Sequence, residues 1–155
     1  MNVAPGANCV ICGGAGQGNE GDSLLGDVRN NTLNINCNID VECFLFSGVT
    51  STGTVSCNTV NVYGVGSSTE AIVYGGSVFV LGCAENNTVN IYKDFSCKGV
   101  VGGIIVSNGT SSFNTVNVFY NSNLNVLDYI YGGRVNVDGI SMNNIVNVYG
   151  NITAI

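Results

Sequence analysis

This chain of 155 residues has no histidine, no tryptophan and a single proline, and only 9% of its residues are charged. The lack of histidine excludes metal sites and nucleophile–base pairs that depend on an imidazole. The four basic residues are scattered, which excludes the clustered positive charge of a nucleic-acid interface or of a polybasic membrane patch. With so little charge, uncharged polar side chains must cover most of the surface.

Long apolar runs are also missing. The longest apolar stretch, from Val100 to Val106, contains two glycines and is far too short to span a bilayer, so we expect no membrane span. The segment that begins at Met1 has neither the basic nor the apolar region of a secretory signal peptide. The chain is then a mature or excised form, leaves the cell by another route, or stays inside. Among these we expect an extracellular location, on a cell or virion surface.

What the sequence does contain is one short phrase, repeated five times. Its copies begin 27, 29, 27 and 30 residues apart, at Asn31, Asn58, Asn87, Asn114 and Asn144. A second phrase, built on a glycine pair, recurs in step with the first and is degenerate at Ser47-Gly48. A fixed period of this length is typical of repeat proteins, in which each unit buries its apolar face against its neighbours.

The repeated phrase predicts β-strands. In Val60-Asn61-Val62 the β-branched residues alternate with a polar one, which is the period of a half-buried strand. A second alternating run follows each glycine pair, and a looser apolar run precedes it. Three short strands per period of about 28 residues predict an all-β fold, a parallel β-solenoid (β-helix) of about five coils. We assign residues 31–155 to the solenoid repeats and residues 1–30 to an irregular Gly- and Cys-rich segment with a first partial coil.

Stacked coils place equivalent residues about 4.8 Å apart, so the repeated side chains should form ladders along the stack. The fourth residue of the phrase predicts an amide ladder, in which each side chain hydrogen-bonds to the next. Its members are Asn34, Asn61, Asn90, Asn117 and Asn147. A threonine ladder runs beside it, through Thr59, Thr88 and Thr115. An outward aromatic ladder follows, through Tyr63, Tyr92, Phe119 and Tyr149. We interpret these ladders as structural.

The second glycine of each pair is predicted to lie at a corner of the coil. Such a corner requires either a positive φ or a close approach of two backbones, and glycine satisfies both requirements. The corner glycines are Gly14, Gly48, Gly76, Gly103 and Gly133.

Seven cysteines are an odd number, so they cannot all pair within one chain. No second C-x-x-C follows the one at Cys9 and Cys12, so a four-cysteine metal site is not indicated. We expect no metal and no cofactor. The cysteines are buried thiols or members of disulfides, and the sequence leaves both readings open for Cys9, Cys12, Cys37, Cys43, Cys57, Cys83 and Cys97.

One arm of each coil has a constant length and the other varies. From Gly48 onward, the distance from the second glycine of a pair to the next phrase is 10 or 11 residues, whereas from each phrase to the next pair it is 16 to 19. Loops of variable length are where ligand specificity usually lies. If the protein binds a ligand, we expect contacts around residues 65–72, 93–99 and 120–129.

The phrases V-Y-G-G at 73–76 and N-T-V-N-V-Y-G at 58–64 resemble repeats in the β-solenoid passenger regions of bacterial autotransporter adhesins. The resemblance covers roughly Val10 to Gly150. It implies an elongated extracellular surface protein without catalysis, and it transfers no catalytic residue to this chain.

Catalysis and ice binding are the weaker alternatives. Polysaccharide-active β-solenoids need paired carboxylates or a metal, and here only Glu42 and Glu70 fall on equivalent positions of adjacent coils. We therefore do not expect an enzyme. A regular Thr and Asn face could bind ice, but the outward aromatic ladder argues against a flat ice-binding plane.

The ends of the stack point to the leading hypothesis. A five-coil solenoid is about 24 Å tall, and each of its ends should expose unpaired backbone and apolar interior. No helical capping sequence follows the last repeat. We predict a structural protein whose copies stack head to tail into an extracellular or surface filament, so that its main partner is itself. The alternative is an adhesin-type module that contacts a glycan or a host protein through its variable loops.

Overall fold

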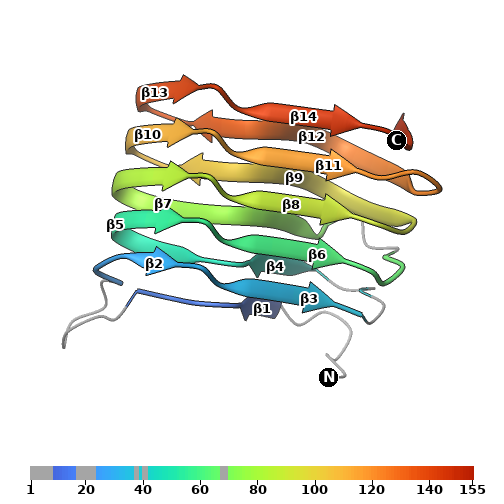
Figure 1. Ribbon diagram of the computed structural model, residues 1–155, viewed down its shortest axis with the longest axis horizontal. Helices are drawn as coiled ribbons and strands as arrows, with labels where there is room; N and C mark the ends of the chain where they lie inside the picture. Colours follow the sequence, from blue (N-terminus) through green and yellow to red (C-terminus); the bar gives the residue numbers. More distant parts are fainter. Residues whose placement is uncertain (1–8, 17–23, 37–38, 40–41, 67–69) are drawn as a thin grey trace.

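The computed structural model describes residues 9–16, 24–36, 39, 42–66 and 70–155. Within these ranges the protein consists of strands and connecting turns, and every strand pair is parallel. The coils stack along one axis, with β3 (Thr32–Ile35) at one end and β14 (Ile145–Val148) at the other (Figure 1). No helix in the described ranges is long and apolar enough to cross a membrane.

Two sheets build the solenoid. The repeated phrase forms a five-stranded sheet, the motif wall, of β3 (Thr32–Ile35), β6 (Thr59–Val62), β8 (Thr88–Ile91), β11 (Thr115–Val118) and β14 (Ile145–Val148). A ten-stranded sheet wraps around the rest of each coil. It consists of β1 (Cys9–Cys12), β2 (Val28–Arg29), β4 (Cys43–Phe46), β5 (Val49–Ser56), β7 (Ile72–Glu85), β9 (Phe95–Ile105), β10 (Asn108–Ser112), β12 (Asn123–Val135), β13 (Asp138–Met142) and β15 (Asn151–Ala154).

The predicted parallel β-solenoid is confirmed. The five strands of the motif wall pair in register, Thr32 with Thr59, Thr59 with Thr88, Thr88 with Thr115 and Thr115 with Ile145. Five layers therefore span about four complete turns. The described part of residues 1–30 adds to the first layer, because β1 pairs with β4 and β2 pairs with β5.

The sequence predicted one strand before each glycine pair and another after it. In β7, β9 and β12 these two strands form one long strand that runs through the glycine pair. β7 pairs with β9 before its bend and with β10 after it. The bend lies at Gly82, which has a φ of 154° and which stacks on Gly53 and Gly109. A Cβ at Gly82 would lie 1.8 Å from the carbonyl oxygen of Gly53 in the coil below, so only glycine fits this corner.

The interior is divided into two apolar clusters. The larger one lies behind the motif wall and includes Val62, Val73, Ile91, Phe95 and Leu124. The smaller one consists of Val28, Val55, Val78, Ala84 and Ile105, with Val135 packed against it. Between the clusters, the glycine pair of each coil packs against the first asparagine of the repeated phrase. The coil is therefore pinched at this position.

Candidate functional site: the amide ladders and the open face of the last coil

The pinch is built from a buried amide ladder that the sequence analysis did not identify. Asn87, in the middle of this ladder, is fully buried. Its Oδ1 accepts hydrogen bonds from the backbone N–H and the Nδ2 of Asn58, at 3.1 and 3.0 Å. Its Nδ2 donates to the carbonyl of Val55 at 2.9 Å and to Oδ1 of Asn114 at 3.0 Å. One side chain thus links three consecutive coils, and its polar atoms are satisfied without water.

The glycine pair makes room for this ladder. A Cβ at Gly76 would lie 2.6 Å from Nδ2 of Asn87, and one at Gly103 would lie 2.5 Å from the amide of Asn114. Neither Gly76 nor Gly103 has a positive φ. Glycine is required at these two positions because the asparagine side chain approaches the backbone closely. From Gly48 onward, the glycine and the asparagine that meet across the interior of one coil are 10 or 11 residues apart. That constant spacing was the sequence signal for the buried ladder.

A left-handed residue turns each buried asparagine inward. The residue before it has a φ of 53° to 59°, at Asn30, Cys57, Asn86, Phe113 and Asn143. Asparagine tolerates this conformation better than most side chains, which explains three of the five positions.

The predicted outer amide ladder is confirmed. Each Nδ2 donates to the Oδ1 of the equivalent residue one coil below, at 2.8 to 2.9 Å, through Asn61, Asn90, Asn117 and Asn147 down to Asn34. The threonines Thr59, Thr88 and Thr115 pair in register on the same wall and are half-buried. The aromatic rings of Tyr63, Tyr92 and Phe119 stack at centroid distances of 4.8 and 4.5 Å, and Tyr149 continues the row with a tilt at 6.4 Å.

The two amide ladders have opposite polarity. In the buried ladder each asparagine donates toward the C-terminal end of the stack, whereas in the outer ladder each donates toward the N-terminal end. The last coil therefore presents the backbone N–H of Asn144 and the Oδ1 of Asn147. Within the described residues no hydrogen bond uses these two groups, nor the Oδ1 of Asn31 and the Nδ2 of Asn34 on the first coil. The groups at one end are the complements of those at the other.

The interior of the last coil is open. Val146 and Val148 are 39% and 47% exposed, whereas Val116 and Val118, their partners in the coil below, are fully buried. Ile152 is 41% exposed above the fully buried Leu124. These residues, with Ala154 beside them, form a surface that we call the open face.

The first coil differs. Ile35, Cys9 and Val28 occupy interior positions of the first layer and are all buried. The expectation that both ends expose their apolar interior is therefore correct for the last coil and wrong for the first. The periodic sequence gave no signal for this difference, because equivalent positions carry similar residues at both ends.

The acidic pair considered for catalysis is not assembled into a site. Glu42 and Glu70 are exposed, and Nζ of Lys98 lies 3.5 Å from Oε2 of Glu70 as a partly solvated ion pair. In the described ranges no three metal-ligating side chains gather. The variable arm is also less loop-like than expected, because β9 begins at Phe95 and β12 at Asn123; residues 67–69 lie outside the described ranges.

The cysteines are spread along the stack. Cys9 pairs in register with Cys43 on the neighbouring strand, and both are buried. Cys9, Cys12, Cys57, Cys83 and Cys97 carry free thiols, and Cys37 lies outside the described ranges. Burial raises the pKa of the Cys97 thiol to about 12, so this thiol stays protonated at neutral pH. Burial also raises the pKa of Cys12.

Comparison with protein-family models, with curated proteins and with solved structures finds no match for this chain. The resemblance to autotransporter passenger repeats therefore rests on the repeated phrases.

Proposed function

We propose that this is a structural protein that assembles by stacking the open face of one copy onto the first coil of the next. The observation that carries the proposal is the exposure of Val146, Val148 and Ile152, whose equivalents in every inner layer are buried. Burying an aliphatic side chain of this size is worth about 1.5–3 kcal/mol. A β-edge beside such a surface readily pairs with another strand, so a further coil would cover both the side chains and the backbone.

The polarity of the amide ladders supports head-to-tail stacking. A following first coil offers Oδ1 of Asn31 to the N–H of Asn144, and Nδ2 of Asn34 to Oδ1 of Asn147. In a tail-to-tail dimer, two copies of Asn147 would face each other with their acceptors. Head-to-tail contacts do not close, so they generate a fibre.

A matched pair of substitutions on β14 tests the proposal. Val146 faces the interior and Ile145 faces outward, and both are already exposed in the single chain, at 39% and 50%. Val146→Lys should leave the monomer folded and abolish assembly, because the ammonium group would be buried in the joint. Ile145→Lys should assemble nearly as the parent does. Sedimentation velocity over a range of concentrations measures both. Equal behaviour of the two variants would show that the open face is not the joint.

A location outside the cell, on a cell or virion surface, is part of the same proposal. It is supported by the low charge and by the continuous ladders, which suit a durable fibre. Immunogold labelling of intact particles or cells should decorate their surface; label confined to the interior of sectioned cells would contradict this part of the proposal alone. The adhesin alternative predicts a discrete particle that binds a glycan array, and binding would be lost on exchange of residues 120–122.

A further inference from the structure

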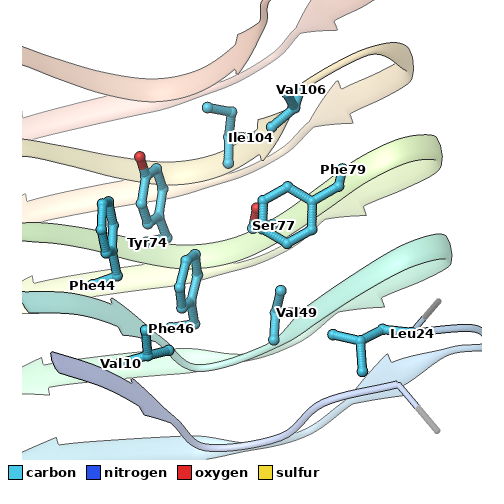
Figure 2. Close-up of a pocket in the computed structure, with 10 residues that line it drawn as sticks. All are labelled: Val10, Leu24, Phe44, Phe46, Val49, Tyr74, Ser77, Phe79, Ile104 and Val106. Atoms are coloured by element: carbon cyan, nitrogen blue, oxygen red, sulfur yellow. The ribbon is translucent and has the colours of Figure 1, made fainter. Parts of the chain in front are cut away.

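The pinch of the coil has a consequence on the outer surface. Where the ten-stranded sheet bends inward at the glycine pairs, its outer side is concave. Outward side chains from both sides of the pairs line the resulting groove (Figure 2). The rings of Phe44, Phe46 and Tyr74 lie on one side of it, and Phe79 and Val106 lie on the other. The groove runs across several coils, from β1 to β9.

This groove has the size and the lining of a site for an apolar ligand. Its volume is about 370 Å³, within the range of about 300–1,000 Å³ found for ligand pockets. The floor is formed by Phe46, Val49 and Ile104, which are nearly buried, and the rim includes Phe79, which is 40% exposed. Among the ten lining residues only Tyr74 and Ser77 carry polar side-chain atoms, too few to recognise a sugar.

Beside the groove, two further tyrosines contact the guanidinium group of Arg134. The ring of Phe46 stacks on Tyr74 at 5.0 Å, and burial, together with the neighbouring hydroxyl of Tyr129, raises the pKa of Tyr74. The guanidinium carbon of Arg134 lies 5.4 and 5.2 Å from the ring centroids of Tyr129 and Tyr131. Arg134 pairs in register with Ile104 of the groove floor, so the cation stands one strand beyond the apolar lining.

Arg134 is available to a ligand. Both ion pairs found in the described residues involve other cations, Arg29 with Asp27 and Lys98 with Glu70, and no described carboxylate lies within 4 Å of Arg134. In a chain with a net charge of -6, a half-buried guanidinium held on two tyrosines beside an apolar groove favours a ligand with one anionic end. Because the groove lining is apolar, the rest of that ligand should be apolar as well.

We propose that the groove binds a single-chain amphiphile with an anionic head, such as a long-chain fatty carboxylate. The alkyl chain lies along the rings of Phe46, Tyr74 and Phe79, and the carboxylate accepts hydrogen bonds from the guanidinium of Arg134. This proposal is independent of end-to-end assembly, because the groove lies on the side of the stack and the open face lies at its end.

Isothermal titration of the Val146→Lys protein with hexadecanoate, below the concentration at which hexadecanoate forms micelles, tests the proposal without interference from assembly. We expect saturable binding that weakens about twofold to fourfold for each methylene removed from the chain, since each buried methylene contributes to affinity. Hexadecanol, which lacks the charge, should bind about tenfold more weakly.

Two variants and one control locate the site. Arg134→Gln should remove the preference for the carboxylate over the alcohol while leaving the binding of the alcohol unchanged. Phe79→Ser should weaken both ligands, because it removes part of the groove rim. Tyr120→Ser removes an aromatic ring that is 71% exposed and does not line the groove, and it should change nothing.

Four results would overturn the proposal. The first is no heat of binding up to the micellar limit. The second is binding that Phe79→Ser and Tyr120→Ser affect equally. The third is association only with phosphatidylglycerol vesicles and not with the free carboxylate, which would make the groove a membrane contact. Self-association that Phe79→Ser abolishes, in place of ligand binding, would assign the groove to a second copy and would equally contradict the proposal.

Discussion

The first and the last coil carry the same kind of residue at equivalent positions, yet these side chains differ in how far they are exposed. Ile35 and Val148 stand at the two ends of one register-matched row; Ile35 is 4% exposed and Val148 is 47% exposed. The inner members of the row, Val62, Ile91 and Val118, are fully buried. The repeat thus determines which side chains point inward, whereas it does not determine how far the inward side chains of the two end coils are buried.

This difference gives the stack a direction. The last coil offers apolar side chains together with a donor at Asn144 and an acceptor at Asn147, whereas the first coil offers the complementary amide groups and has most of its interior apolar side chains already covered. Assembly should therefore begin at the open face. The substitutions below test the contrast between inner and end positions, and all are to be measured under conditions in which the protein is monomeric.

The largest effect should come from the buried amide ladder. Asn87→Ala removes the partners of Asn58 and Asn114 and of the Val55 carbonyl, all of which are buried, so we expect a loss of about 3–5 kcal/mol in the free energy of unfolding. Asn144→Ala removes the same residue type at the end of the stack, where water can replace lost partners, and should cost about 1 kcal/mol. Urea unfolding followed by circular dichroism compares them. An equal decrease in the free energy of unfolding for the two variants would mean that the buried position of the ladder adds nothing to stability.

A smaller contrast is expected in the apolar row. Val116→Ala leaves a cavity in a fully buried layer and should cost about 2 kcal/mol, whereas Val146→Ala, at the open face, should cost less than about 0.5 kcal/mol. The same unfolding experiment measures both. A costly Val146→Ala in the monomer would show that the last coil is covered within the single chain.

Alkaline pH should destabilise the middle of the stack through Cys97. Its thiol ionises near 9 in an ordinary environment and near 12 in the folded chain, so the folded state binds the proton more tightly. The associated stability is complete below about pH 9 and is lost as the pH rises toward 12, at about 1 kcal/mol per pH unit. Cys97→Ala should remove this part of the pH dependence between pH 9 and 10, measured by thermal unfolding. An unchanged slope would contradict the burial of this thiol.

Thiol labelling should distinguish the two ends without changing stability. With iodoacetamide at pH 8, the exposed Cys57 should react fast, and the buried Cys9 and Cys97 should be protected. A cysteine introduced by Val146→Cys should react nearly as fast as Cys57. Mass spectrometry of peptides gives each rate. Fast labelling of Cys9 would show that the first coil is as open as the last and would remove the asymmetry.

Much of the fold follows from the sequence, because the period and the alternation act through local rules. The outer ladder through Asn61 was predictable because it lies in an alternating strand. The buried ladder through Asn58 was not predicted: the constant spacing between glycine and asparagine was its only signal, and the first residue of the phrase lies in a turn, after Cys57 in a left-handed conformation. The corner with a positive φ lies at the single Gly82 and was not predicted, whereas the paired glycines serve a close approach, which was one of the two reasons expected for them. The open face and the groove depend on which layers are neighbours, and a periodic sequence does not encode that.

Electron microscopy of the purified protein at neutral pH, with averaging along any filament axis, tests the central claim most directly. Head-to-tail stacking predicts unbranched filaments with a subunit rise near 24 Å, which is five strand spacings of about 4.8 Å. Discrete particles of one or two subunits at all concentrations would contradict it, because they would show that the open face is not a joint between successive copies.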